Sequence, residues 1–252
     1  LGIFHDGYNK ERVDCEKIIM TSSDIITTSS LFEEDLILKN YNVDFNKLKL
    51  ITPGVDTEIF SPDSTLKREN IFLSIGRIQE QKGQIETIKF LDNFKKVENN
   101  FTCYFVGGPS GKSGNEYLVE LKQTVVDLNL ESHIEFLDNL PQTEIRDLLN
   151  KSKLLIHTSK FETFGLVAAE ANAMGVPVLT TNSGSLLEIV ENSKNGYYSD
   201  NLIDGNVNNF VKELLNNKDK FDEIMMNCLE KSKAYSWANT ATEIENLYKT
   251  FV

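Results

Sequence analysis

The stretch that decides the fold is residues 71–94, which read IFLSIGRIQEQKGQIETIKFLDNF. A short apolar run that ends at a glycine is typical of a strand buried on both faces, and an amphipathic helical segment follows it after a short polar loop. Similar pairs of short apolar runs and longer amphipathic segments recur along most of the chain, which is the pattern of βα units around a parallel sheet. We therefore predict an α/β fold with a Rossmann-like, doubly wound parallel sheet.

The same pattern gives the individual elements. It predicts strands at residues 25–28, 48–52, 71–75, 102–106, 134–137, 154–158 and 178–180. It predicts helices at residues 31–39, 84–94, 116–128, 142–150, 166–174, 207–215 and 240–251. Residues 52–64 are rich in turn formers and lack periodicity, so we expect the interdomain linker there.

Length and composition restrict the class of protein. A chain of 252 residues can hold one complete α/β domain and part of another. No apolar run reaches the roughly 18 residues that a membrane-spanning helix needs. The net charge of -12 argues against binding to nucleic acid or to anionic lipid, since both require a basic face.

The three cysteines and the first residue give two further expectations. Cys15, Cys103 and Cys228 are odd in number and far apart, which favours reduced thiols and a cytoplasmic protein over a disulfide framework or a zinc site. Because the chain opens at Leu1 with residues typical of a strand end, we expect that an upstream portion is missing.

The first candidate site is the loop of residues 74–83, SIGRIQEQKG. Parallel-sheet folds bind ligands beyond the carboxyl ends of their strands. Arg77 can grip two phosphate oxygens, and Lys82 adds a compact charge, so the pair suits a diphosphate. On spacing alone, a solvated loop with two ordinary surface cations explains these residues equally well.

The second candidate site is residues 161–178, where Glu162 precedes a predicted helix that carries Glu170. At helical spacing, eight residues make roughly 2.2 turns, so we expect both carboxylates on a similar side, where they can accept hydrogen bonds from sugar hydroxyls. The backbone N–H groups of Phe164, Gly165 and Leu166 could bind an anion or a hydroxyl. Two surface acids would be the ordinary interpretation, but the apolar helix around Glu170 makes an unpartnered acid there costly.

Two weaker features follow other strands. In the run YFVGGP at residues 104–109, Gly107 and Gly108 follow the predicted strand. A ligand could approach the backbone closely at these glycines, although a plain turn explains them as well. Residues 182–190 form a loop that leads into a helix, with serine capping as the simplest explanation.

Five motifs in order resemble the retaining nucleotide-sugar glycosyltransferases of family four, also called glycosyl transferases group 1. They are TPGVDTEIFSP (52–62), SIGRIQEQKG (74–83), YFVGGP (104–109), ETFGLVAAEANAMGVPVL (162–179) and YSW (235–237). The resemblance implies a GT-B fold, in which two Rossmann-like domains face each other. It divides this chain into a remnant of the N-terminal acceptor domain with the linker (1–62), a donor-binding domain (63–235) and a C-terminal helix that packs back toward the N-terminal domain (236–252).

The resemblance also implies roles for residues. Arg77 and Lys82, next to Gly76, match the pair that neutralises the donor diphosphate, and Glu162 matches the acid that holds the transferred sugar; these are the catalytic candidates. Glu170 matches the acid that holds the ribose. The remaining donor-side candidates are Gly107, Leu140 near the nucleobase, and the segment Thr163, Phe164, Gly165 and Leu166. His5 could match an acceptor-side histidine, and a packing or capping histidine explains it equally well.

The function implied is transfer of a hexose from a nucleoside-diphosphate sugar to an acceptor hydroxyl with retention of configuration, without a metal or other cofactor. The acceptor could be a saccharide, a lipid-linked saccharide or a small molecule. Because most of the acceptor domain lies outside this chain, a noncatalytic nucleotide-sugar-binding module is an alternative. A nucleotide-sugar epimerase on the same scaffold is a further one.

Overall fold

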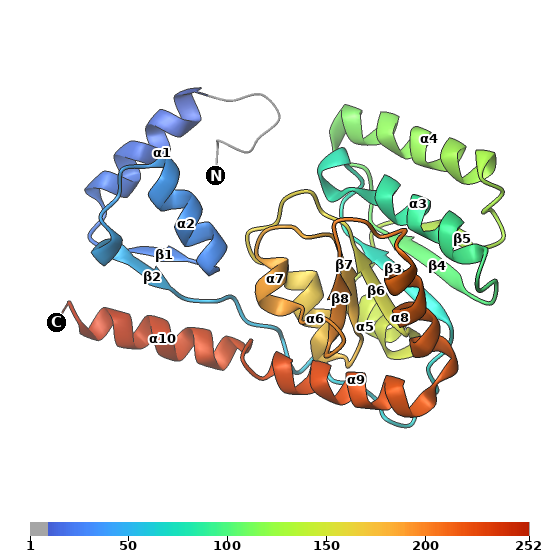
Figure 1. Cartoon of the computed structure of the whole chain (residues 1–252). Helices are drawn as coiled ribbons and strands as arrows, with labels where there is room; N and C mark the ends of the chain where they lie inside the picture. The colour runs from blue at the N-terminus through green and yellow to red at the C-terminus, as the bar shows by residue number, and fades with distance from the viewer. Residues whose placement is uncertain (1–9, 252) are drawn as a thin grey trace.

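The computed structural model describes residues 10–251 and contains a six-stranded parallel sheet with helices on both faces, beside a smaller two-stranded unit (Figure 1). The large sheet consists of β3 (Ile71–Ile75), β4 (Thr102–Val106), β5 (Ile134–Leu137), β6 (Leu154–His157), β7 (Val178–Thr180) and β8 (Gly196–Tyr198). Its strand order is β5-β4-β3-β6-β7-β8.

This strand order has a reversal point. The chain adds β4 and β5 on one side of β3, and then returns to place β6, β7 and β8 on the other side. β3 and β6 are hydrogen-bonded neighbours, with Phe72 opposite Leu154. In doubly wound sheets, ligands bind beyond the carboxyl ends of the strands at such a reversal, so the turns after β3 and β6 define where a site is expected.

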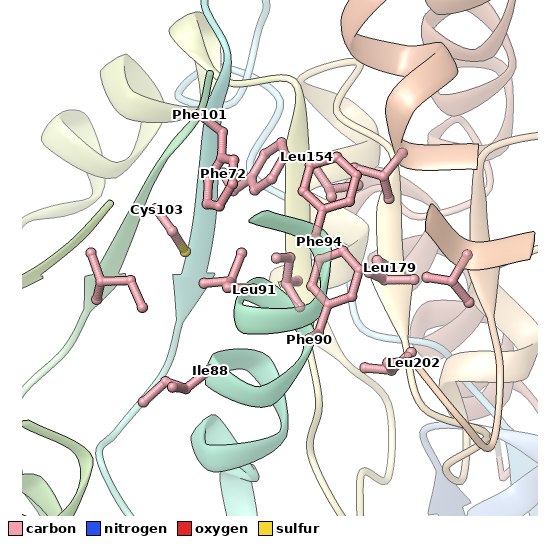
Figure 2. Close-up of a cluster of buried hydrophobic side chains, with 14 of the residues drawn as sticks. Phe72, Ile88, Phe90, Leu91, Phe94, Phe101, Cys103, Leu154, Leu179 and Leu202 are labelled. Atoms are coloured by element: carbon pink, nitrogen blue, oxygen red, sulfur yellow. The ribbon is translucent and has the colours of Figure 1, made fainter. Parts of the chain in front are cut away.

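One face of the sheet packs against α3 (Gln84–Lys95), α4 (Gly111–Asp127) and α8 (Gly205–Asn216). Figure 2 shows the centre of this core, where the rings of Phe72 and Phe101 stack at 5.2 Å and Phe94 lies 5.9 Å from Phe72. All three rings are buried, and such aromatic contacts contribute beyond the area that they remove from water.

The opposite face packs against α5 (Gln142–Lys151), α6 (Leu166–Ala173) and α7 (Leu186–Ile189). Along β3, Phe72 belongs to the first core, while Leu73 and Ile75 belong to the second. This alternation follows from the two-residue period of a strand, and it explains why β3 reads as a continuous apolar run.

The smaller unit is built from α1 (Lys10–Ser22), β1 (Ile26–Thr28), α2 (Leu31–Asn40), a short 3-10 helix η2 (Phe45–Lys47) and β2 (Leu48–Leu50). β1 and β2 are parallel, and the unit has its own small core of Val13, Ile37, Tyr41 and Leu48. Figure 1 shows this unit beside the large sheet, with the segment after β2 running across to it.

The last two helices, α9 (Lys218–Ser232) and α10 (Trp237–Lys249), return along the molecule, and α10 extends beneath the two-stranded unit (Figure 1). The Thr240 hydroxyl donates to the Thr52 carbonyl at 2.8 Å. A Cβ on Gly54 would lie 2.1 Å from the Trp237 nitrogen, so only glycine lets the two segments cross this closely. Within residues 10–251, no helix is long and apolar enough to cross a membrane.

The predicted doubly wound parallel α/β fold is confirmed, but several element predictions were wrong in detail. β2 ends at Leu50 and β6 at His157, whereas α4 begins five residues before its predicted start, at Gly111. α10 begins at Trp237, where Ser236 accepts a hydrogen bond from the Asn239 N–H as N-cap. The helix expected within residues 182–190 is present as α7, whereas α1, α9 and β8 were not predicted.

Candidate functional site

The turns after β3 and β6 meet at the reversal point of the sheet. The turn after β3 contains the 3-10 helix η3 (Glu80–Lys82), and the turn after β6 contains Glu162. Lys82 Nζ lies 2.8 Å from Glu162 Oε2, and the two side chains are only 22% and 17% exposed. Two of the predicted site residues, 80 positions apart in the sequence, are therefore in direct contact.

Glu162 has a second partner in His157, at the carboxyl end of β6. His157 Nε2 lies 3.2 Å from Glu162 Oε2. Burial alone favours the neutral carboxyl, but the hydrogen bond with His157 and the charge of Lys82 outweigh it and lower the pKa of Glu162 to about 2. Glu162 is therefore a fixed anion at neutral pH, ready to accept hydrogen bonds.

His157 was not among the predicted site residues. The signal was present, because His157 is the single polar residue of the strand LLIH and stands at its carboxyl end. His157 is buried. It reaches the candidate site because β6 lies beside β3, and this long-range pairing of strands cannot be read from the strand's own sequence.

Arg77 differs from Lys82 in its surroundings. It is exposed, and no acidic partner for its guanidinium is found among residues 10–251. Its backbone is held instead, because Gln84 Nε2 donates to the Arg77 carbonyl at 2.8 Å. A free guanidinium on a fixed backbone can grip two oxygens of an incoming phosphate without first leaving a protein carboxylate.

Two glycines keep these turns close together. A Cβ on Gly83, which has φ +67°, would lie 2.1 Å from the Thr158 carbonyl oxygen after β6. A Cβ on Gly107, at φ +138°, would lie 2.2 Å from the Gly76 carbonyl oxygen. Because neither glycine has a side chain, the backbones of the turns after β3, β4 and β6 can approach each other closely. A ligand at these turns can therefore approach the backbone as well.

The segment from Thr163 to Leu166 leads into α6. Among residues 10–251, no acceptor is found for the backbone N–H groups of Phe164, Gly165 and Leu166. Gly165 has φ +91° and precedes the first turn of α6, and Phe164 is buried with its ring edge against Tyr235, 5.5 Å between centroids. Free N–H groups at a helix N-terminus favour anions and hydroxyl oxygens.

Glu170 lies within α6 and is partly buried, and no partner for its carboxylate is found in the described part of the chain. Burial raises its pKa to about 7. The expectation that helical spacing aligns Glu162 with Glu170 was wrong in its reason, because α6 starts only at Leu166. Glu162 lies in the preceding loop, and Lys82 and His157 orient it.

Leu140 lies further along the same edge of the sheet, in the loop after β5. It is partly buried and packs against the core of the α6 face. The neighbouring Asn139 accepts a hydrogen bond from the Gly108 N–H at 2.9 Å, which ties the loops after β4 and β5 together. Because β3, β4 and β5 are adjacent and parallel, Gly76, Gly107 and Leu140 follow one another away from the reversal point.

The other expectations have different outcomes. His5 lies outside the described residues. Ser185 does not cap α7 with its side chain; its hydroxyl donates to the Glu162 carbonyl at 3.0 Å instead.

Within residues 10–251, no three His, Cys, Asp or Glu side chains gather where they could hold a metal ion.

A separate cavity of about 620 Å³ lies at the opposite edge of the sheet, between the segment before β3 and the helices α8 and α9. Its lining includes Lys153, which immediately precedes β6, together with Phe221 and Met225. Its lining is partly apolar, and it faces the amino ends of the strands. We assign the candidate site to the carboxyl ends, where the complementary charges and the free backbone N–H groups lie.

A parallel sheet that reverses its strand order, with a cationic turn and an acidic turn at the reversal, defines a doubly wound, Rossmann-like α/β protein whose ligand site is expected beyond the carboxyl ends of the strands. The family model for glycosyl transferases group 1 matches residues 56–233, which is more than half of the chain. The protein belongs to this family.

Curated relatives agree with this assignment. The D-inositol 3-phosphate glycosyltransferase of Corynebacterium glutamicum (strain R) is 26% identical over 252 residues, covering 93% of this chain and 59% of that protein. The enzyme of the same name from Nocardioides sp. is 26% identical over 257 residues, covering 94% and 56%. The chain thus spans little more than half the length of these relatives.

Solved structures show the same fold. Anabaena HepE, in complex with UDP and glucose, superposes with a TM-score of 0.84 at 19% identity, covering 96% of this chain and 67% of that one. Sucrose-phosphate synthase from Thermosynechococcus elongatus gives 0.82 at 23% identity, covering 97% and 62%. At these identities the likeness establishes the fold alone, and the six-stranded sheet matches a Rossmann-like domain of the GT-B type.

Proposed function

We propose that the protein containing this chain is a retaining glycosyltransferase, and that this chain carries its donor site. The single observation that supports the proposal most strongly is the convergence of Lys82, Glu162 and the free Arg77 at the reversal point of the sheet. The relatives are named glycosyltransferases, and HepE was solved with UDP-glucose. Residues 63–235 would form the donor domain, and residues 1–62 part of the acceptor domain.

The proposed orientation of the donor follows the order of the strands. The diphosphate would lie at Arg77 and Lys82 after β3, with the sugar at Glu162 after β6. The nucleoside would extend across Gly107 after β4 toward Leu140 after β5, and Glu170 would accept hydrogen bonds from the ribose. The free N–H groups of Phe164, Gly165 and Leu166 would bind sugar hydroxyls or phosphate oxygens.

Catalysis would come from charge placement. Breaking the bond between the anomeric carbon and the diphosphate leaves negative charge on the departing phosphate while the sugar gains oxocarbenium character. Arg77 and Lys82 would stabilise that charge more in the transition state than in the ground state. Lys82 has three N–H donors, so it can contact phosphate while it stays paired with Glu162.

The transferred group and the acceptor belong to the same proposal. We propose a hexose as the transferred sugar, because a carboxylate and several backbone N–H groups together match a ring with several hydroxyls. The acceptor would be a saccharide, a lipid-linked saccharide or a small molecule bound by the acceptor domain. Three unpaired cysteines, two of them buried, support a cytoplasmic location.

Calorimetry tests donor binding directly. UDP, GDP and ADP are titrated into the chain, and the matching nucleotide-sugar is then incubated with it while products are separated. Binding of one nucleoside diphosphate followed by release of free sugar supports the transferase. Binding without any turnover, also in the parent protein, supports the noncatalytic module, and an epimerised nucleotide-sugar supports the epimerase. Binding of none of the three contradicts the donor site.

A further inference from the structure

The amino end of α2, in the two-stranded unit, is attached both to α7 and to the loop that carries Glu162, and Ser185 before α7 donates to the Glu162 carbonyl. The Glu188 carboxylate accepts hydrogen bonds from the Leu31 N–H at 3.1 Å and the Phe32 N–H at 2.9 Å. These are first-turn N–H groups, which have no acceptor within their own helix. A carboxylate at this end is also favoured by the helix dipole.

Ser30 makes a second attachment. Its hydroxyl accepts a hydrogen bond from the Glu33 N–H at 3.0 Å, as N-cap of α2, and donates to the Thr163 carbonyl. Ser30 is buried, so no water competes for these contacts. One hydroxyl thus joins the start of α2 to the residue directly after Glu162.

Ring packing completes the attachment. The ring of Phe32 lies 5.7 Å from the ring of Phe161, the residue directly before Glu162. Gly184 separates Phe32 from the Glu162 backbone, since a Cβ there would lie 3.0 Å from the Phe32 ring and 2.4 Å from the Glu162 carbonyl oxygen. Both sequence neighbours of Glu162 are therefore in contact with α2.

We propose that the amino end of α2 is a clamp that positions Glu162 for the transferred sugar, with Ser30 and Glu188 as its positioning residues. The inference rests on the proposed role of Glu162 in holding the sugar. The clamp reaches the turn after β6 and does not touch Arg77 or Lys82 after β3. Breaking it should therefore weaken the grip on the sugar more than the grip on the diphosphate.

Two variants and one control separate this role from general stability. Glu188→Gln removes the charge and one of the two acceptor oxygens. Ser30→Gly keeps a tolerated N-cap residue but removes the hydroxyl on Thr163. Asp35→Asn is the control, because Asp35 is an exposed acid on the same helix that pairs only with Lys39 in the described part of the chain.

Hydrogen exchange in the free chain tests the mechanical part. We expect the amides of Lys160 and Ser185, which donate to the Gln81 and Glu162 carbonyls, to exchange at least about tenfold faster in both variants, since the clamp that holds this loop is lost. Residues 74–83 should be unchanged, as should all these amides in Asp35→Asn. Unchanged exchange of the Lys160 and Ser185 amides in both variants would overturn the clamp.

Ligand titration tests the functional part, with UDP and UDP-glucose as probes. The variants should bind UDP within about twofold of the unaltered chain and UDP-glucose at least about fivefold more weakly. An equal loss for both probes overturns the positioning role, because it indicates general destabilisation. If the unaltered chain binds neither probe, the donor site itself fails, and the exchange result alone decides whether the clamp holds the Glu162 loop.

Discussion

The two cations after β3 have different roles because their surroundings differ. Lys82 is paired with Glu162, whereas Arg77 is exposed and has no acidic partner among residues 10–251. Removing Arg77 should therefore leave the fold intact while it removes charge stabilisation from the departing diphosphate. Arg77 is the position where function and stability can be separated most cleanly.

Arg77→Ala should lower turnover by about 30- to 1,000-fold in the intact two-domain enzyme, corresponding to about 2–4 kcal/mol of transition-state stabilisation. Its free energy of unfolding should change by less than about 0.5 kcal/mol. Steady-state kinetics and urea denaturation measure the two quantities. Arg146→Ala, which alters an arginine on α5 paired with Asp147, is the matched control. Turnover equal to that of the unaltered enzyme would refute the role of Arg77.

The partly buried carboxyl of Glu170 should make the free energy of unfolding depend on pH. Burial raises its folded-state pKa to about 7, so between pH 4.5 and 7 the folded protein holds the proton more tightly than the unfolded chain does. Stability is therefore lost as the pH rises through this window. The loss is at most about 3 kcal/mol, and partial solvent exposure reduces it to about 1–2 kcal/mol.

Glu170→Gln should accordingly stabilise the free chain by about 1–2 kcal/mol at pH 8 and change its stability little at pH 5, because the amide stays neutral. Urea denaturation at both pH values measures this, with Glu131→Gln, an exposed acid, as control. The same variant should weaken nucleotide-sugar binding. A gain in the free energy of unfolding at pH 5 as large as that at pH 8 would show that burial does not disfavour the ionised form of Glu170.

At the scale of elements, the contact between the turns after β3 and β6 depends on Gly83. Gly83→Ala combines an unfavourable φ of +67° with a Cβ 2.1 Å from the Thr158 carbonyl, and we expect it to cost at least about 2 kcal/mol. Gly111→Ala is the control, because Gly111 has the same φ with nothing within 4 Å. Thermal denaturation compares them. Equal losses would mean that backbone strain alone matters and that the two turns can separate.

Most strands and helices of the large sheet could be predicted because apolar periodicity reports burial directly. β8 was missed since its three residues, Gly196–Tyr198, form no apolar run at the sheet edge. α9 was missed because a single residue, Asn217, separates it from α8 and caps it. The early start of α4 was missed because its first turn contains Gly111 and Gly114, which are poor helix formers.

The candidate site shows the same division between local and long-range information. The types and order of Arg77, Lys82 and Glu162 could be identified from motifs. The partnership of Glu162 with His157 and Lys82 could not, because it depends on β6 returning to lie beside β3. The attachment of Glu188 to α2 is likewise a contact across 156 positions, for which the sequence carries no local signal.

At the scale of the whole molecule, the described residues join the two-stranded unit to the large sheet through several contacts. The amino end of α2 contacts the Glu162 loop, and α10 contacts the linker through Thr240 and Thr52. Figure 1 shows α10 running beneath the smaller unit while the linker passes to the sheet. The proposed donor site therefore lies next to the junction of the two units, where an acceptor bound by the N-terminal side would meet it.

The most direct test of the central claim is a crystal structure of the chain with UDP-glucose. We predict the diphosphate within hydrogen-bonding distance of Arg77 and Lys82, and the glucose hydroxyls on Glu162, beyond the carboxyl ends of β3 and β6. A diphosphate bound elsewhere, for example at Lys153 in the cavity at the amino ends of the strands, with Arg77 and Lys82 free of ligand, would contradict the account.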